Sequence, residues 1–342
     1  MTNSSPYRRV PTLNDVAARA GVSPKTVSRA LNNEGNVRPD KVAKVLAAAS
    51  ELGFKPNEFA RLLRTRGKSS IIGVVTADVG DPFWSGVLRG IEVAVSGGDR
   101  FILSASTRDR SDREAEIVSA MVERRVMALL IVPTTDDQSH LAAVTAAGTP
   151  VVCVDRPARR ADVDAVVADD IGGAERGIHL LLDHGHRRIA FLATPSIHTT
   201  GQRLIGYRKA LSAAGIREDE RLVDAAIPGA DLVEPVVRRM LALDEPPTAV
   251  FAANVAMSIG VLALMRPLHW APAMIAFSDF DAARIADPMV TVVDNDPVLL
   301  GRRAAELALE RLDGYAGPPR LVRLDTPLVI RESHAVVATV NR

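Results

Sequence analysis

From residue 71 onward, apolar runs of strand length alternate with amphipathic segments of helix length. The runs cover residues 71–77, 101–106, 128–133, 151–155, 165–169, 188–194, 249–254, 274–278 and 290–296. Strands that are apolar throughout and alternate with helices are typical of parallel sheets that helices cover on both faces. Nine runs exceed one simple sheet, so this part of the chain is predicted to form two lobes with a cleft between them.

Open parallel sheets bind ligands at the carboxyl ends of their strands, so the residues that follow the runs are the site candidates. They are Asp81, Phe83, Trp84, Asp155, Arg203, Asn254, Ser278, Asp279 and Asn295. We expect Asp155 and Arg203 to face each other from opposite strand ends. The pair Phe83-Trp84 is expected to stack on a flat face of a ligand or to cover a sugar ring.

The chemistry of these candidates favours a sugar, a polyol or a sugar derivative, because carboxylates and amides pair with hydroxyl groups. A nucleobase or nucleoside would depend more on the aromatic pair and less on the acidic side chains. Structural roles are the alternative for each residue. Asp155 can cap a turn, Arg203 can pair with a surface carboxylate, and Trp84 can fill the space between the lobes.

The first seventy residues follow a different pattern, in which short helices are separated by turn residues. Leu13, Val16, Ala17 and Ala20 recur at helical spacing, Thr12 or Asn14 can cap the start, and Gly21 fits a left-handed stop. Ser23 can cap a second helix that begins at Pro24, where the missing N–H costs nothing. Two short helices joined by a tight turn containing glycine predict a helix-turn-helix.

The outward face of the second helix carries the candidates for reading DNA. They are Ser23, Pro24, Lys25, Thr26, Ser28, Arg29 and Asn32, with Thr12 at the start of the first helix. Arg29 can pair with guanine through two hydrogen bonds, and Lys25 and Ser28 can reach bases or phosphates. The alternative is a plain helical hairpin with solvated charges. A third helix is expected up to Gly53, with a buried stripe of Val42, Val45, Leu46, Ala49 and Leu52.

Residues 56–70 are predicted to form a hinge segment with a short basic helix from Glu58 to Arg64, which becomes ordered against a partner. Asn57 can cap it, Arg61 and Arg64 make it basic, and Leu63 is apolar on a segment with no core of its own. Such a helix can fold in the DNA minor groove and insert a leucine between base steps. The alternative is a linker whose leucines contact the neighbouring domain.

The charge distribution supports a polyanion-binding module at the start of the chain. Residues 1–70 contain thirteen Lys and Arg against five Asp and Glu, a net charge of +8, whereas the remaining residues carry a net −7. The start lacks the apolar segment of a signal peptide, and no apolar stretch is long enough to span a membrane, so we expect a cytoplasmic protein. One cysteine, Cys153, excludes an intrachain disulfide.

Motifs for catalysis or metal binding are weak. Gly172-Gly173 is a minor hint of a phosphate loop, and His184-Gly-His186 is better explained by structural histidines around a helix stop. No trustworthy Ser-His-Asp order, close acid–base pair or metal cluster emerges. We therefore expect no cofactor and no enzymatic activity; the alternative of a sugar hydrolase or isomerase would require turnover of a bound sugar.

The chain resembles the LacI/GalR family of transcription regulators along nearly its whole length. The resemblance rests on TLNDVAARAGVSPKTVSRALN (12–32), LAAASELGFKPNEFARLLRT (46–65), PVVCVDRP (150–157), HGHRRIAFL (184–192), PTAVFAAN (247–254) and VTVVDNDPVLLGRRAAELALERLDG (290–314). It implies a homodimer whose heads each read half of a pseudo-palindromic operator in double-stranded DNA. Pro24, Lys25 and Arg29 occupy the base-reading places, and Leu63 that of the inserted leucine.

The resemblance also implies an all-α helix-turn-helix head on an α/β core like that of periplasmic binding proteins, with two Rossmann-like lobes. The expected domains are the head (1–55), the hinge (56–70) and the core (71–342). Within the core, the N-lobe takes about 71–168 plus 297–325, and the C-lobe about 169–296 plus the C-terminal segment.

Three departures from the family pattern argue against a typical hexose effector. Val255 follows the asparagine of the FAAN element, Ser278 stands where an acidic sugar partner is common, and the connection 260–277, which contains Trp270, is short. The expected function is a ligand-responsive repressor controlled by a small sugar or sugar derivative. The alternatives are the same regulator with a nucleobase or nucleoside effector, and a soluble sugar-binding protein without a role at DNA.

Overall fold

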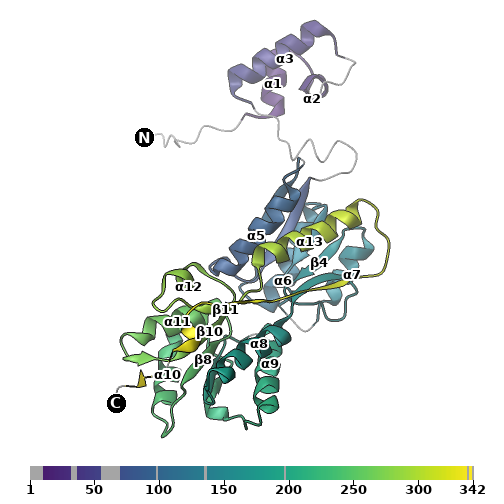
Figure 1. Ribbon diagram of the computed structural model, residues 1–342. Helices are drawn as coiled ribbons and strands as arrows, with labels where there is room; N and C mark the ends of the chain where they lie inside the picture. Colours follow the sequence, from purple (N-terminus) through teal and green to yellow (C-terminus); the bar gives the residue numbers. More distant parts are fainter. Residues whose placement is uncertain are drawn as a thin grey trace. The chain divides into compact units, whose positions relative to one another are not determined.

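The computed structural model describes residues 11–31, 37–54, 70–97, 99–134, 137–195, 198–336 and 339–340. The chain divides into two compact units, Met1–Ser69 and Ser70–Arg342 (Figure 1). We call the described part of the first unit the head and the second unit the core, and each is considered by itself.

Three helices of the head pack around a small apolar centre. They are α1 (Leu13–Ala20), α2 (Pro24–Leu31) and α3 (Pro39–Leu52). Val16, Val27 and Val45, one from each helix, are fully buried. The predicted stripe on α3 is wrong at Leu46, which is 53% exposed; Ala48 is buried instead.

The chemistry of the helix ends explains the turn between α1 and α2. The Thr12 hydroxyl accepts a hydrogen bond from the backbone N–H of Asp15, and the Asp15 carboxylate accepts one from the N–H of Thr12 at 2.7 Å. Gly21 ends α1 in the left-handed region with φ of 63°, where glycine has no steric cost. The predicted helix start at Thr12 and stop at Gly21 are confirmed.

The N-lobe of the core is a six-stranded, fully parallel sheet in the order β12-β5-β4-β3-β1-β2. Its strands are β1 (Ile71–Thr76), β2 (Phe101–Ser106), β3 (Ala128–Ile131), β4 (Val151–Val154), β5 (Asp164–Ala168) and β12 (Leu321–Leu324). Its helices are α5 (Pro82–Val95), α6 (Ser111–Glu123), α7 (Ser139–Ala146) and α13 (Pro297–Leu312).

The C-lobe is a second six-stranded sheet in the order β13-β11-β10-β8-β6-β7, parallel except for the β11–β13 pair. Its strands are β6 (Ile189–Leu192), β7 (Val223–Asp224), β8 (Ala249–Ala252), β10 (Ala273–Phe277), β11 (Thr291–Val293) and β13 (Leu328–Val329). Its α-helices are α8 (Asp170–Asp183), α9 (Thr199–Ala213), α10 (Val233–Leu241), α11 (Val255–Met265) and α12 (Asp281–Ile285).

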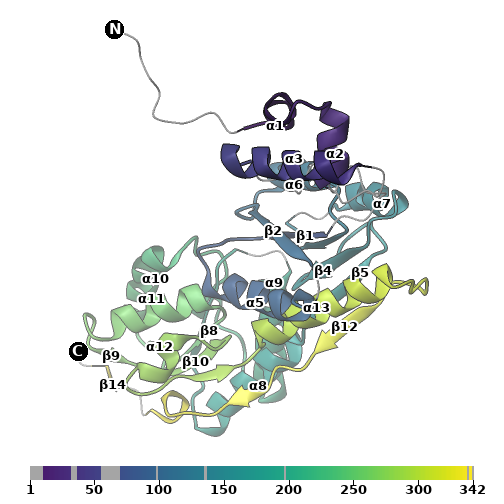
Figure 2. The ribbon, with the colours of Figure 1, turned by 90° about the horizontal axis from the view of Figure 1, so that it is seen from above.

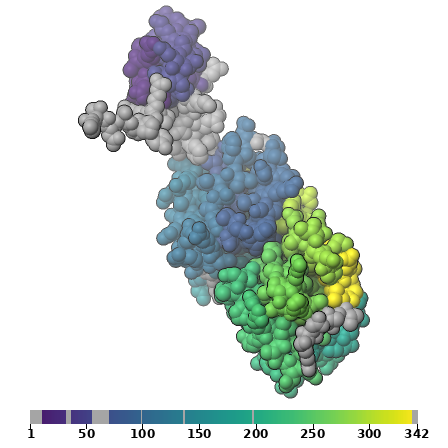
Figure 3. Space-filling view, turned by 90° about the vertical axis from the view of Figure 1, so that its left-hand side faces the viewer, coloured from purple at the N-terminus to yellow at the C-terminus, as the bar shows by residue number. Residues whose placement is uncertain are grey.

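Short elements complete the C-lobe. They are η1 (Glu220–Leu222), η2 (Ala230–Leu232), η3 (Ser333–Ala335), and the antiparallel pair β9 (Trp270–Ala271) and β14 (Thr339–Val340). Trp270, in the connection that the sequence marks as short, is 2% exposed and packs in the lobe's apolar core. The C-terminal segment, yellow in Figure 3, lies against the green surface of the C-lobe.

All nine predicted apolar runs contain strands of the two sheets. The expectation that each is buried on both faces is wrong for β2, which forms an edge of the N-lobe sheet and leaves Phe101 59% exposed. Sequence pattern did not reveal β7, β12 and β13, which are short or only half-buried.

Glycines bring the backbones of two helices together in each lobe. A Cβ added to Gly90 of α5 would lie 2.0 Å from the backbone oxygen of Val298 on α13, and one added to Gly301 of α13 would lie 2.0 Å from that of Val87. Figures 1 and 2 both show α5 and α13 side by side. In the C-lobe, Gly206 of α9 approaches α8 in the same way.

The described chain crosses between the lobes at 169, at 294–296 and at 325–327, and we call these segments the crossovers. Figure 2 shows the last of them, where the yellow chain runs from β12 toward the C-lobe. Backbone hydrogen bonds join the crossovers: Asp169 N–H donates to the Leu324 oxygen and Asp294 N–H to the Pro327 oxygen, each at 2.8 Å. Among the described helices, none is long and apolar enough to cross a membrane.

Candidate functional site

The first candidate site is the outer surface of α2 in the head. The Ser23 hydroxyl accepts a hydrogen bond from the N–H of Thr26 at 3.2 Å, and Pro24 is the first helical residue, as predicted. Val27 and Ala30 pack into the head, which leaves Pro24 and Lys25 exposed. Thr26, Ser28 and Arg29 are half-buried.

Basic residues on the first half of α3 add to this polar surface, and the sequence analysis did not select them. Arg38, Lys41 and Lys44 are exposed, and the two lysines lie one helical turn apart on the same face. Their position outside the apolar stripe of α3 was the available signal. An ion pair between Arg19 and Glu51 ties α1 to the end of α3.

Several predicted DNA-contacting residues lie outside the described residues. They are Asn32, Asn57, Arg61, Leu63 and Arg64.

The second candidate site lies at the carboxyl ends of the core strands, where Arg203 of α9 is 6% exposed. Its Nε donates to Asp170 Oδ1 at 2.7 Å, and its Nη1 donates to the backbone oxygen of Ala253 at 2.6 Å. Its guanidinium also lies 3.7 Å from the ring centre of Phe277. Burial raises the pKa of Asp170, and the charge of Arg203 opposes this rise.

Asp170 is therefore the direct partner of Arg203, and sequence reasoning missed it. Asp155, which we expected to face Arg203, pairs instead with Arg156 across 3.6 Å. Arg156 in turn donates to Asp109 at 2.8 Å. Asp155 remains within the electrostatic reach of Arg203.

Asp155 is a buried carboxylate in an uncommon backbone conformation. It is 4% exposed and its φ is 68°, in the region that non-glycine residues seldom occupy. Burial raises the pKa of Asp155 to about 6, against the opposing charges of Arg156 and Arg203. A side chain of this kind suits a ligand that supplies hydroxyl donors, because such donors favour the charged form.

The aromatic pair at the start of α5 divides between the site and the lobe core. Asp81 caps the helix by accepting a hydrogen bond from Phe83 N–H at 2.9 Å, and burial raises its pKa. The rings of Phe83 and Trp84 meet edge to face at 4.9 Å. Trp84 is 5% exposed and belongs to the N-lobe core, so the expected stacking surface is wrong for Trp84; Phe83 is half-buried.

Two further candidates have their polar atoms bound by the protein itself. Asn254 caps α11 through the N–H of Met257 and donates to the Thr194 hydroxyl at 2.9 Å. Asp279 accepts two hydrogen bonds from Arg331, at 3.0 and 2.7 Å, and two from Arg284, at 3.3 and 2.8 Å. Burial raises the pKa of Asp279, but these arginines outweigh it and hold the pKa below its usual value.

Ser278 directly follows β10, and Asn295 lies two residues after the end of β11. Ser278 is 4% exposed with φ of 79°. Asn295 is 2% exposed, and neither its Oδ1 nor its Nδ2 has a hydrogen-bond partner in the part of the chain that the structure describes. A buried amide without partners is costly, so the Asn295 amide is suited to donate hydrogen bonds to and accept them from a ligand that reaches it.

Other motifs from the sequence have structural roles. His184 Nδ1 donates to the backbone oxygen of Leu180 at 2.8 Å, and its ring meets the ring of His334 edge to face at 4.6 Å. The His186 ring contacts the Thr248 hydroxyl at 3.1 Å. Burial raises the pKa of the Cys153 thiol to about 12. Within the described residues, no group of three or more His, Cys, Asp or Glu could hold a metal ion.

Comparison with known proteins finds matches in both the head and the core of the chain. Residues 12–57 match the model "Bacterial regulatory proteins, lacI family", and residues 178–334 match "Periplasmic binding protein-like domain". The chain is 34% identical over 339 residues to the HTH-type transcriptional regulator CelR of Thermobifida fusca, covering 95% of this chain and 99% of CelR.

Two solved structures of transcriptional regulators also match the chain along most of its length. A CelR–cellobiose complex matches with a TM-score of 0.67 and 30% identity, covering 94% of this chain and 99% of that one. The lac repressor dimer bound to operator and an anti-inducer matches with a TM-score of 0.76 and 26% identity, covering 96% and 100%.

Proposed function

This chain belongs to the lacI family of bacterial regulatory proteins, and we propose that it is a cytoplasmic repressor whose binding to operator DNA responds to a small sugar or sugar derivative. The observation that carries the proposal is the match to CelR along 95% of the chain, which includes the head as well as the core. Its relatives are transcriptional regulators, and the protein is not an enzyme.

Recognition of DNA is assigned to α2. Its exposed start would enter the major groove, where Lys25 and Arg29 can bond to base edges and Pro24 cannot. Lys41 and Lys44 on α3 are exposed cations that can contact phosphates. Direct reading therefore falls mainly on Lys25 and Arg29, and the operator is specified by fewer direct contacts than a polar residue at position 24 would allow.

The experiment for this site compares Arg29→Ala with Lys44→Ala on duplexes selected from a random pool by the full chain. Arg29→Ala should cost about 1–3 kcal/mol on the preferred duplex and relax the base preference at one position of each half-site. Lys44→Ala should weaken all duplexes equally and reduce the salt dependence of binding. If Arg29→Ala retains the affinity and base preference of the parent, α2 does not read DNA as proposed.

A sugar or sugar derivative is favoured over a nucleobase as the effector because of what the cleft offers. Asp155, Arg203 and Asn295 carry polar atoms suited to hydroxyl groups, whereas Trp84 packs among the apolar side chains of the N-lobe core. CelR has been solved with cellobiose, which supports a carbohydrate. Ser278 supplies a hydroxyl where a carboxylate is common in the family, so a hexose need not be the ligand.

A thermal-shift screen with cellobiose, D-galactose, xylose, polyols and nucleobases tests this choice, because a ligand that binds the folded state raises its melting temperature. We expect a carbohydrate to give the largest shift, and Asn295→Ala to reduce that shift. A shift with nucleobases alone would favour the alternative effector. Carbohydrate binding by a chain that ignores duplex DNA at low salt would favour a binding protein without a role at DNA.

We further propose a homodimer, as in the lac repressor dimer bound to operator. Large apolar side chains lie exposed on the core: Ile285 is 84% exposed on α12, Ile259 43% on α11 and Val93 58% on α5. Exposed apolar residues on helices of both lobes are what a contact between copies of the chain would bury.

A further inference from the structure

Two consecutive carboxylates, Asp169 and Asp170, lie where the chain first crosses between the lobes. Asp170 pairs with Arg203 in the proposed effector cleft at 2.7 Å. Asp169 belongs to the crossover and caps α8 by accepting a hydrogen bond from Gly172 N–H at 3.2 Å. A movement of the Arg203–Asp170 pair therefore acts on Asp169 through a single peptide bond.

Asp169 is bound to the last crossover through Thr326, which is fully buried. The Thr326 hydroxyl donates to the Asp169 backbone oxygen at 3.0 Å and accepts from Arg176 Nη2 at 2.9 Å. The same Nη2 donates to the Thr326 backbone oxygen at 2.9 Å, and Arg176 Nη1 lies 3.5 Å from the Asp169 carboxylate. We call Asp169, Arg176 and Thr326 the latch.

The adjacent glycines that the sequence singled out make room for the latch. A Cβ on Gly173 would lie 2.3 Å from the Thr326 hydroxyl oxygen, and a Cβ on Gly172 would lie 2.1 Å from an Asp169 carboxylate oxygen. A side chain at either position would require neighbouring side chains, including those of the latch, to shift. Gly172-Gly173 thus has a role at the crossovers between the lobes and not in binding phosphate.

We propose that the latch couples the effector cleft to the crossovers between the lobes. In this arrangement, an effector that draws Arg203 and Asp170 toward itself pulls Asp169 against Thr326 and changes the alignment of the crossovers. The proposal rests on the function assigned above. Residues 169, 170, 176, 203 and 326 lie in one connected chain of contacts, and measured coupling along this chain is what the proposal requires.

Hydrogen exchange in the full chain tests the latch without any ligand. The probes are the N–H groups of Asp169 and Asp294, whose hydrogen bonds join the crossovers. Thr326→Val keeps the shape and removes the hydroxyl, and it should speed exchange at both probes about tenfold while the amides of β4 keep their parental rates. Thr326→Ser, which retains the hydroxyl, should restore slow exchange.

Two other variants distinguish loss of the latch from a general loss of stability as the cause of faster exchange. Arg176→Gln changes an exposed side chain of the latch and should also speed exchange at Asp169. Thr145→Val removes a hydroxyl that bonds within α7 and should leave both probes unchanged. Unchanged exchange at Asp169 in Thr326→Val, or equal acceleration throughout both sheets, would overturn the proposal.

A double-mutant cycle measures the coupling itself. Arg203→Gln, Thr326→Val and the double variant are compared by exchange at Asp169. If the latch transmits the state of Arg203, the effect of the double variant should differ by at least about threefold from the product of the single effects. If the effect of the double variant equals the product of the two single effects, the latch is not coupled to Arg203.

Operator binding with and without cellobiose then separates this proposal from the proposed function. Absence of DNA binding in the parent chain would contradict the function and leave the exchange result to decide on the latch. If cellobiose changes the operator affinity of the parent, the change should shrink at least about threefold in Thr326→Val. If cellobiose changes the operator affinity of Thr326→Val as much as that of the parent, the proposed role of the latch is wrong.

Discussion

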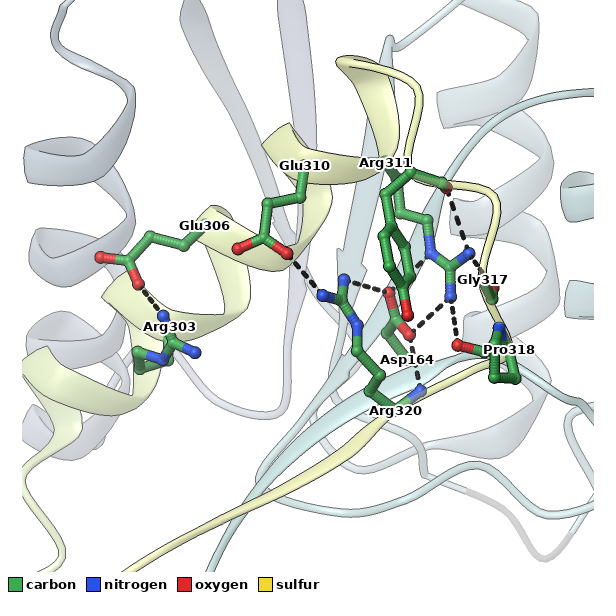
Figure 4. A network of polar contacts seen from close by, with 9 residues as sticks. Asp164, Arg303, Glu306, Glu310, Arg311, Gly317, Pro318 and Arg320 are labelled. Atoms are coloured by element: carbon green, nitrogen blue, oxygen red, sulfur yellow. Dashed lines mark hydrogen bonds and ion pairs between the residues drawn. The ribbon is translucent and has the colours of Figure 1, made fainter.

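Asp164, at the start of β5, is the buried centre of the polar network in Figure 4. It is 2% exposed, and its carboxylate accepts from Arg311 Nε and Nη2 at 2.8 and 2.9 Å. It also accepts from the backbone N–H of Arg320 at 2.7 Å. The network thereby fixes the end of α13 and the start of β12 to the N-lobe sheet, so Asp164→Asn is expected to weaken the attachment of both.

The cost of Asp164→Asn follows from these contacts. Removing one partner of a buried ion pair typically costs about 3–5 kcal/mol. Arg311 also donates to the backbone oxygens of Gly317 at 2.6 Å and Pro318 at 3.0 Å, which continue to satisfy part of its charge. We therefore expect the lower end, about 3 kcal/mol, which lowers the melting temperature of the core by roughly 6–12 °C.

Urea and thermal unfolding of the full chain measure this cost, with Asp112→Asn as the matched control. Asp112 pairs with Arg110 on the surface, where its side chain is 62% exposed, and such exposed pairs contribute little to stability. If Asp164→Asn is no more destabilising than Asp112→Asn, the network does not stabilise the lobe as argued.

The pH dependence gives a second measurement of the same pair. Burial raises the pKa of Asp164, but hydrogen bonds from Arg311 and Arg320 outweigh it, so the pKa in the folded protein is below its usual value. The stabilisation is then fully present above about pH 4, the usual Asp pKa, and is lost as the pH falls further. The stability difference between parent and Asp164→Asn should shrink only below that pH.

Three further predictions address packing, assembly and the cleft. Gly90→Ala places a methyl group 2.0 Å from a backbone oxygen of α13 and should cost about 2–4 kcal/mol in urea unfolding, whereas Gly97→Ala, with nothing within 4 Å, should change stability by less than about 1 kcal/mol. Ile285→Asp should weaken the homodimer at least about tenfold in sedimentation, and equal dissociation by Val79→Asp, also at an exposed residue, would argue against α12 as the contact. Because burial raises the pKa of Asp155 to about 6, the contribution of this side chain to core stability should fall as the pH rises from about 4 to about 6, and the stability difference between parent and Asp155→Asn should change over this range.

The elements that the sequence predicted correctly are those set by local chemistry. The strand runs, the cap at Thr12, the stop at Gly21 and the helix start at Pro24 depend on a few neighbouring residues, and all are present. Errors arose where a side chain's direction was assigned without helical geometry. Leu46 follows the buried Val45 and is turned by about 100° from it, which carries it out of the stripe.

The same geometry explains the aromatic pair. Phe83 and Trp84 are consecutive in a helix, so they point about 100° apart and cannot both cover one ligand face. The partner of Arg203 could not be predicted from the sequence for another reason. Asp170 is 33 residues away, and it meets Arg203 only because Gly206 lets α9 approach α8 closely. Close helix contacts of this kind have no signature in local spacing.

The hydrogen-bond partners of the candidate residues separate the structural side chains from those suited to a ligand. Asn254 and Asp279 have protein partners for the polar atoms that a sugar would need. Asn295, on a crossover, has none among the described residues, and Asp155 follows a strand of the N-lobe. A ligand that forms hydrogen bonds with both Asn295 and Asp155 must contact the N-lobe and a crossover together. Its binding free energy then acts on the relative position of the lobes, because the same contacts cannot form if the lobes move apart.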